Sequence, residues 1–238
     1  MKTGILIPLD RHGRILKKVH LYLSDLEVFL YDTTGAITVL LEALPHADTE
    51  LILKILPLLG YAGRDRVLGP LYKLMLSPEK DEQVRRLAAL QLGTAASLSD
   101  DPSAMIGKLI ENLNHPEPSV RSGSALALGW EGNWAAVESL VAHLSDPDEE
   151  VQASVVAALS SVGDERVFNI LRARLESGTA EQQRNILLNL WRFAERNPHV
   201  EDVYVGCLDR VDPELRLEVL CVLAILPLST TILDIYRQ

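Results

Sequence analysis

The segments HPEPSVRSGSALALG (residues 115–129) and DPDEEVQASVVAAL (residues 146–159) decide the fold of this 238-residue chain. Each begins with a short polar turn that contains proline and an acidic residue, and each continues as a run of alanine, valine and leucine. An acidic side chain at such a turn accepts hydrogen bonds from the free amides of a following helix and opposes the positive end of the helix dipole. Both segments are therefore predicted to begin an α-helix.

The same helical start recurs along the chain at a nearly constant interval. The six starts begin at Leu51, Val84, Val120, Val151, Gln183 and Leu215, and they are separated by 33, 36, 31, 32 and 32 residues. In each unit a first helix precedes the turn and a second helix follows it. Tandem helix pairs with this period are typical of stacked helical solenoids, in which each pair contacts its neighbours. We therefore expect an all-α repeat fold.

Two regions are expected, a basic segment of residues 1–22 and a solenoid of about six helix pairs over residues 23–238. In the first region Val19, Leu21 and Leu23 alternate with other residues, which predicts a strand, and the stretch 5–7 supplies a partner strand for a small β-hairpin. At the other end, residues 229–236 are predicted to form a helix that caps the stack.

An acidic residue lies three positions before five of the six helical starts. These residues are Asp48, Asp81, Glu117, Asp148 and Asp212, while Thr179 is expected to replace the acid in the remaining unit. Arginines recur one position after the start, at Arg85, Arg121, Arg184 and Arg216. They either tie the turns of adjacent repeats together or form a row that binds an acidic partner. The first interpretation is favoured, because a column that recurs in every unit suits a stacking rule.

Aromatic residues provide a second set of candidates for partner binding. Tyr61, Trp130 and Phe193 each lie ten positions after a helical start, Trp134 follows closely, and Arg192 is next to Phe193. Such residues either pack between repeats or form a row along one edge that anchors a partner. The candidate partner-binding residues are therefore Tyr61, Arg85, Arg121, Trp130, Trp134, Arg184, Arg192 and Phe193.

The charge of the chain narrows the classes of partner. The formal net charge is −10, whereas residues 1–22 carry five basic side chains and one acidic side chain. An acidic body disfavours general nucleic-acid binding, which depends on cationic contacts to phosphate. No apolar run approaches the length of about 20 residues that a membrane span needs, and no secretory leader is evident. A cytoplasmic protein that binds neither nucleic acid nor membrane is expected.

No residue pattern predicts catalysis, a metal site or a cofactor. The six histidines lack the spacings of metal ligands on a helix, and Cys207 and Cys221 form no metal-binding or disulfide framework. Neither a glycine-rich phosphate loop nor a nucleophile elbow is present. A protein that is not an enzyme is therefore expected, although abundant carboxylates leave a catalytic acid pair open.

The segments 115–129 and 146–159 resemble HEAT repeats, in particular the short HEAT-like repeats of phycobilisome lyases. The resemblance covers residues 34–226 and is strongest over residues 81–163. It implies a right-handed α–α superhelix in which the second helix of each pair lines the concave face. It also implies roles as a scaffold, an adaptor or an assembly factor.

Two functions follow from these observations. The first is a scaffold or adaptor that binds another protein or a peptide segment on the concave face or an edge. The alternative is a lyase-like or chaperone subunit that handles a bilin or another prosthetic group. The scaffold is favoured, because an array of this kind offers an extended surface and carries no recognisable catalytic constellation. The oligomeric state and the role of the basic segment are left open.

Overall fold

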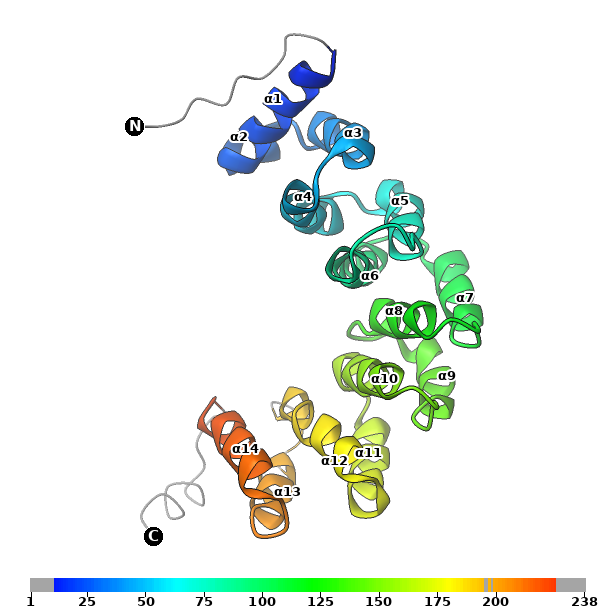
Figure 1. The fold of residues 1–238 in the computed structure, drawn as a ribbon, viewed down its shortest axis with the longest axis vertical. Coiled ribbons are helices and arrows are strands. Elements are labelled where there is room, and N and C mark those ends of the chain that lie inside the picture. Colours follow the sequence, from blue (N-terminus) through cyan, green and yellow to red (C-terminus); the bar gives the residue numbers. More distant parts are fainter. Residues whose placement is uncertain (1–10, 195–196, 198, 226–238) are drawn as a thin grey trace. The chain divides into compact units, whose positions relative to one another are not determined.

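The computed structural model describes residues 11–194, 197 and 199–225. Over these residues the chain consists of fourteen α-helices and three short 3-10 helices, and this part contains no strand (Figure 1). The all-α helical-repeat class predicted from the sequence is confirmed. The chain divides into two compact units, Met1–Lys108 and Leu109–Gln238, with the boundary inside helix α7 (Ser103–Asn112).

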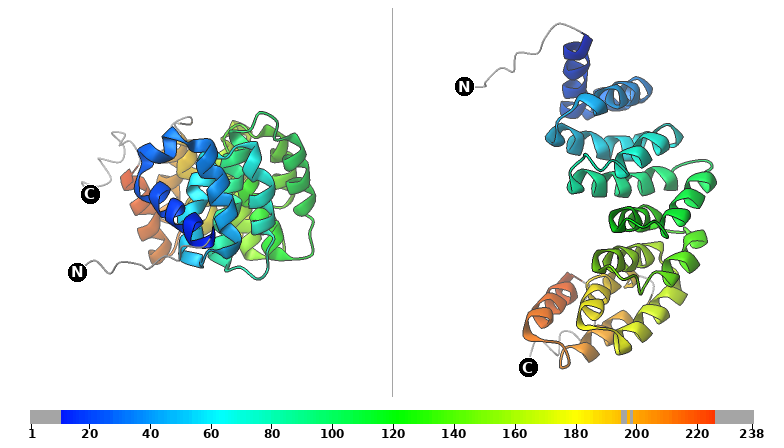
Figure 2. Two further views of the ribbon diagram at one scale, coloured as in Figure 1. Left: turned by 90° about the horizontal axis from the view of Figure 1, so that it is seen from above. Right: turned by 45° about the vertical axis from the view of Figure 1, so that its right-hand side comes forward.

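Two helix pairs and a leading segment make up the first unit. Its helices are α1 (Arg11–Ser24), α2 (Leu26–Tyr31), α3 (Thr33–Ala43), η1 (Leu44–His46), α4 (Thr49–Ala62), α5 (Asp65–Met75) and α6 (Glu82–Ser97). The second helices α4 and α6 lie side by side, and α5 packs against α6 (Figure 2). Ile52, Leu56 and Leu59 of α4 are fully buried in this core.

The strand predicted around Val19, Leu21 and Leu23 is wrong, because these residues belong to helix α1. The buried residues of α1 include Val19 and Tyr22, three positions apart, whereas Leu21 is exposed. That spacing places one face of a helix against α3 and α2. Alternation over five residues is too short to distinguish a strand from a helix. The stretch 5–7, expected to pair with this strand, lies outside the described residues.

Alternating first and second helices continue through the second unit. After the end of α7 come α8 (Pro118–Leu128), η2 (Trp134–Ala136), α9 (Val137–Ala142), α10 (Glu149–Val162), α11 (Glu165–Ser177), α12 (Ala180–Leu187), η3 (Leu190–Phe193), α13 (His199–Cys207) and α14 (Pro213–Ile225). Helix α10 packs against α8, α9, α11 and α12. The cap predicted for residues 229–236 lies outside the described residues.

Polar contacts repeat at the interval predicted from the sequence. In the second unit the Ser122 and Ser154 hydroxyls lie 2.9 Å apart, and the Gln182 side-chain amide donates to Gln152 Oε1 at 3.0 Å. In the first unit the Thr49 hydroxyl donates to Asp81. These pairs are separated by 32, 30 and 32 residues. Positions within one or two residues of equivalence in neighbouring repeats are therefore in contact.

The helix starts are capped largely as predicted. Side chains of Asp48, Asp148 and Asp212 accept hydrogen bonds from backbone amides of the following first turn. Thr179 forms a reciprocal capping box with Gln182. Asp81 and Glu117 occupy the N-cap positions of α6 and α8, but neither makes a side-chain capping bond.

Candidate functional site

Arg121 lies in the first turn of α8 and forms a buried, two-point ion pair with Asp146. Its Nε donates to Asp146 Oδ2 at 2.8 Å, and its Nη2 donates to Oδ1 at 2.7 Å. The remaining Nη1 group donates to the carbonyl oxygens of His115 and Pro116 at 2.9 and 3.1 Å. Arg121 is 9% exposed and Asp146 is 7% exposed. The guanidinium thus joins the turn before α8 to the turn before α10.

Electrostatics stabilises the charged form of this pair. Burial of Asp146 acts to raise its pKa, but hydrogen bonds from Arg121 and from the Asp148 amide lower it, and the pKa is lowered overall. The hydrogen bond to Asp146 also raises the pKa of Arg121. A buried charge whose three nitrogens all donate hydrogen bonds is suited to holding repeats together rather than to receiving a ligand.

The other arginines of this column also lie within the repeat framework. Arg184 of α12 pairs with Glu218 of α14, which belongs to the next repeat. Arg216 donates from Nε to the Leu208 carbonyl at 2.8 Å, just before its own helix. Arg85 is half-buried on α6 in the first unit. Arg121 and Arg184 thus contact the next repeat, whereas the contacts of Arg216 stay within its own repeat.

The predicted aromatic residues divide into core and surface groups. Phe193 is 2% exposed and makes an edge contact with Phe168, with ring centroids 5.7 Å apart. Trp130 is half-buried, whereas Trp134 is 54% exposed. Tyr61 is exposed at the end of α4, in the first unit.

A short loop holds Trp130 and Trp134 at the end of the second helices of the second unit. The Gly132 amide donates to the carbonyl of Val162, the last residue of α10, at 3.2 Å. Gly132 has a φ of 82°, which glycine adopts without steric cost. The buried Asn133 side chain donates to the Leu128 carbonyl at 2.9 Å. The loop is thereby fixed between the ends of α8 and α10.

The 3-10 helix η3 carries a further exposed aromatic residue. It packs against α10 and α11 and exposes Trp191, which is 37% accessible. The Arg192 guanidinium stacks over the Trp191 ring, with its central carbon 4.8 Å from the ring centroid. We define the aromatic edge as Trp130, Trp134, Trp191 and Arg192. Tryptophan and arginine are the residue types that most often dominate binding energy at interfaces.

The candidate partner-binding residues predicted from the sequence include the buried Phe193 and omit the exposed Trp191. The spacing of ten residues after a helical start selected position 193, but α12 ends at Leu187 and a 3-10 helix follows. A 3-10 helix has fewer residues per turn and a longer rise than an α-helix, which changes which residue points outward. The adjacent Trp191 and Arg192 could have indicated an exposed stack, because arginine often packs on the face of a tryptophan ring.

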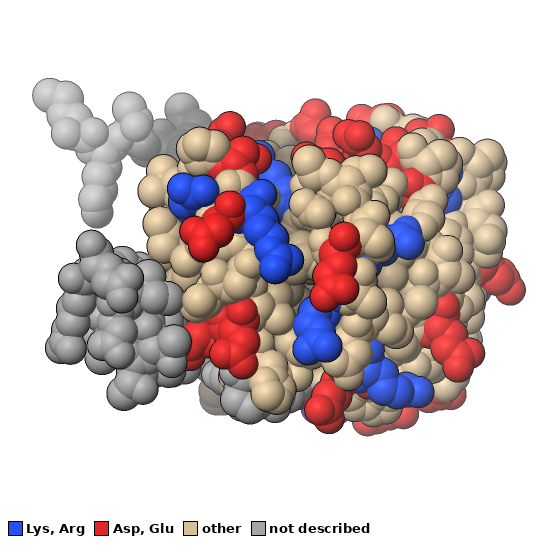
Figure 3. Space-filling view, turned by 90° about the horizontal axis from the view of Figure 1, so that it is seen from below, with Lys and Arg blue, Asp and Glu red and all other residues tan. Residues whose placement is uncertain are grey.

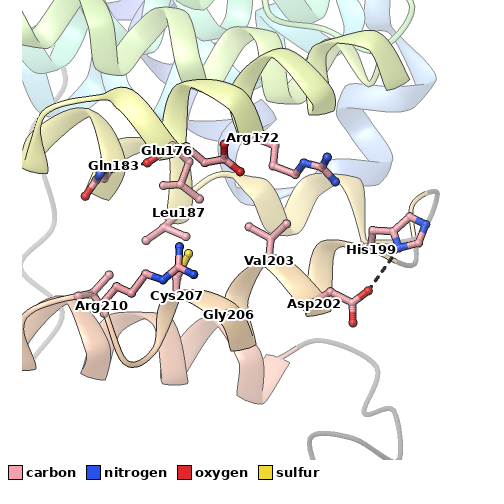
Figure 4. Close-up of a pocket in the computed structure, with 12 residues that line it drawn as sticks. Arg172, Glu176, Gln183, Leu187, His199, Asp202, Val203, Gly206, Cys207 and Arg210 are labelled. Atoms are coloured by element: carbon pink, nitrogen blue, oxygen red, sulfur yellow. Dashed lines mark hydrogen bonds and ion pairs between the residues drawn. The ribbon is translucent and has the colours of Figure 1, made fainter.

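Residues that the sequence did not single out line a cavity in the second unit. It has a volume of about 400 Å³ and lies among α11, α12 and α13 (Figure 4). Charged and polar lining comes from Arg172, Glu176, Gln183, His199, Asp202 and Arg210, and the rest of the lining is Leu175, Leu187, Val203, Gly206, Cys207 and Val211. No spacing in the sequence brings these positions together, because they come from three helices and a loop.

Cys207 is half-buried in the wall of this cavity. Burial raises the pKa of its thiol, and the nearby Arg210 charge only partly offsets that effect. The thiol therefore stays protonated at neutral pH, which makes it a weak nucleophile. Cys221 on α14 is exposed.

Acidic and basic side chains are interspersed with uncharged surface on the face drawn in Figure 3. Arg192 and the cavity arginines are positively charged residues in a chain whose formal net charge is −10. Within the described ranges, no helix combines the length and the apolar character needed to cross a membrane.

Comparison with known proteins supports the repeat assignment. Residues 106–191 match the sequence profile of HEAT repeats. A phycocyanobilin lyase subunit alpha from Picosynechococcus sp. is 32% identical over 90 residues, which represent 38% of this chain and 30% of that protein. The match thus spans less than a third of the relative's length. These findings confirm HEAT-like repeats that resemble those of the lyases.

Proposed function

We propose that this protein is an adaptor that binds a segment of another protein along the aromatic edge of its second unit. The observation that carries the proposal is the exposure of Trp134 and Trp191, the latter stacked by Arg192 at 4.8 Å. Large exposed aromatic side chains on a fixed framework lose little conformational entropy when they bind. The loop bonds at Gly132 and Asn133 provide that framework.

The experiment compares partner capture by the full chain and by two variants. Trp134→Ala combined with Trp191→Ala removes both exposed rings, whereas Tyr31→Ala removes a still more exposed ring of α2 in the first unit. Truncation of a hot-spot residue costs at least about 2 kcal/mol, or roughly 30-fold in affinity. The double variant is expected to lose the captured protein, while Tyr31→Ala retains it. Undiminished capture by the double variant contradicts the proposal.

A second candidate function rests on the relative named as a phycocyanobilin lyase subunit alpha. In this function the chain is a lyase-like or chaperone subunit that handles a bilin or another prosthetic group. Titration of the pure chain with phycocyanobilin, followed by the visible absorbance of the bilin, tests it. A saturable spectral change supports this function, and an unchanged spectrum contradicts it.

A further inference from the structure

The cavity among α11, α12 and α13 combines an apolar floor with an open entrance. Leu187 is fully buried and Leu175 nearly so, and Val203 and Val211 complete the aliphatic surface. A volume of about 400 Å³ falls within the range of about 300–1,000 Å³ typical of small-molecule sites. The floor therefore suits an apolar body of modest size.

The walls carry two guanidinium groups with no carboxylate partner among the described residues. Arg172 projects from α11, and Arg210 extends from the loop after α13 toward Cys207 (Figure 4). The carboxylate of Asp202 is engaged by His199, whose Nδ1 lies 3.3 Å from Asp202 Oδ2. The remaining acidic group, Glu176, lies one helical turn from Arg172 on α11. Two carboxylates therefore accompany two guanidinium groups in the lining. Arg210 makes no ion pair among the described residues and, unlike Arg172, has no lining carboxylate one helical turn away.

Gly206 leaves one wall of the cavity open. A Cβ atom built at this position meets no heavy atom within 4 Å, and the residue lies inside helix α13. Glycine in a helix interior costs about 0.5–1 kcal/mol relative to alanine. A side chain at position 206 is thus accommodated by the fold and occupies space next to Cys207.

We propose that this cavity binds a small organic carboxylate that carries an apolar body. The carboxylate accepts hydrogen bonds from the Arg210 guanidinium group, whose planar fork matches its two oxygens. The apolar body lies on Val203 and Val211, which line the cavity. The site is separate from the aromatic edge, so it does not depend on the adaptor function.

Isothermal titration calorimetry of the full chain with naphthalene-2-carboxylate provides the first test. The matched probe (naphthalen-2-yl)methylammonium has the same ring body and the opposite charge. The carboxylate is expected to bind at least about tenfold more tightly than the ammonium compound, because hydrogen bonds to charged groups are strong. Arg210→Gln is expected to weaken carboxylate binding by at least about tenfold, and Glu176→Gln to strengthen it.

A second test fills the cavity without disturbing the core. Gly206→Leu is expected to abolish binding of the carboxylate, whereas Gly107→Leu, at another open helical position on α7, leaves binding unchanged. Bound naphthalene-2-carboxylate is also expected to protect Cys207, but not the exposed Cys221, from iodoacetamide. Absence of binding at millimolar carboxylate overturns the proposal, as do binding that survives Gly206→Leu and equal affinity for the ammonium probe.

Discussion

At the scale of single residues, the buried ion pair between Arg121 and Asp146 is expected to stabilise the fold of the second unit. Asp146→Asn keeps the shape of the side chain but leaves the buried Arg121 charge without its counter-ion. Breaking a buried pair from one side costs about 3–5 kcal/mol. We expect the free energy of unfolding in urea to fall by that amount. Glu50→Gln, which removes an exposed pair with Lys54, is the control and is expected to cost less than about 1 kcal/mol.

The same carboxylate gives stability a defined pH dependence. The pKa of Asp146 is lowered in the folded chain, and so is that of Asp164, chiefly through its hydrogen bonds from Arg166. A carboxylate with a lowered folded pKa stabilises the fold above its unfolded value of about 3.9, and this contribution is lost as pH falls through the folded pKa. The melting temperature is therefore expected to fall with acidification below about pH 5.

Asp146→Asn should flatten this acid dependence, because one of the carboxylates with a lowered folded pKa is gone. Thermal melts of both proteins between neutral and acidic pH provide the measurement. Parallel acid profiles for the variant and the natural chain would show that Asp146 does not titrate as inferred.

The sequence predicts the role of a residue best where that role depends on neighbours that are close in the chain. For the arginine column a structural role was favoured over partner binding, and Arg121 pairs with Asp146 in the turn of the next repeat. The exposure of Trp191 was not predictable from spacing, since it depends on where α12 gives way to η3. Burial of Phe193 likewise depends on Phe168, a residue of a different helix.

At the scale of elements, α8 and α10 of the second unit approach each other closely at Gly129, at the end of α8. A Cβ atom there would lie 2.6 Å from the Cα of Ala158 on α10. Gly129→Ala is therefore expected to push the two helices apart and to cost about 1–3 kcal/mol, as overpacking does. The measurement is chemical denaturation of the purified variant.

Gly107→Ala is the matched control for this helix contact. A Cβ at position 107 meets no atom within 4 Å, so alanine there is expected to stabilise the protein by up to about 1 kcal/mol. If both substitutions change stability equally, helix propensity and not the α8–α10 contact governs position 129.

Helix starts were the most predictable elements, because their caps are local. Asp48, Asp148 and Asp212 each bond an amide only a few residues away. Helix α1 was mispredicted, because packing against α3 and α2 determines which of its residues are buried. The five residues 19–23 alone do not show that α2 and α3, which follow in the chain, pack against this segment.

At the scale of the whole molecule, the repeat interval is the property that the sequence revealed most directly. It is observed as contacts such as Ser122 with Ser154, which are 32 residues apart. The cavity among α11, α12 and α13 was not predictable in this way. Its lining depends on the relative placement of three helices and on the conformation of the loop that carries Arg210.

A repeat array distributes stability unevenly, because each element depends on its immediate neighbours. In the second unit α10 packs against α8, α9, α11 and α12, whereas α13 packs chiefly against η3 and α14. Backbone amides of α8 and α10 are therefore expected to exchange with deuterium at least about tenfold more slowly than those of α13 and α14. Hydrogen-exchange mass spectrometry resolves these peptides. Asp146→Asn should accelerate exchange in α8 and α10 with a smaller effect on α14, whose contacts do not include the ion pair. Equal exchange along the unit, or a variant that accelerates all its helices alike, would indicate a single cooperative block instead of neighbour-by-neighbour stabilisation.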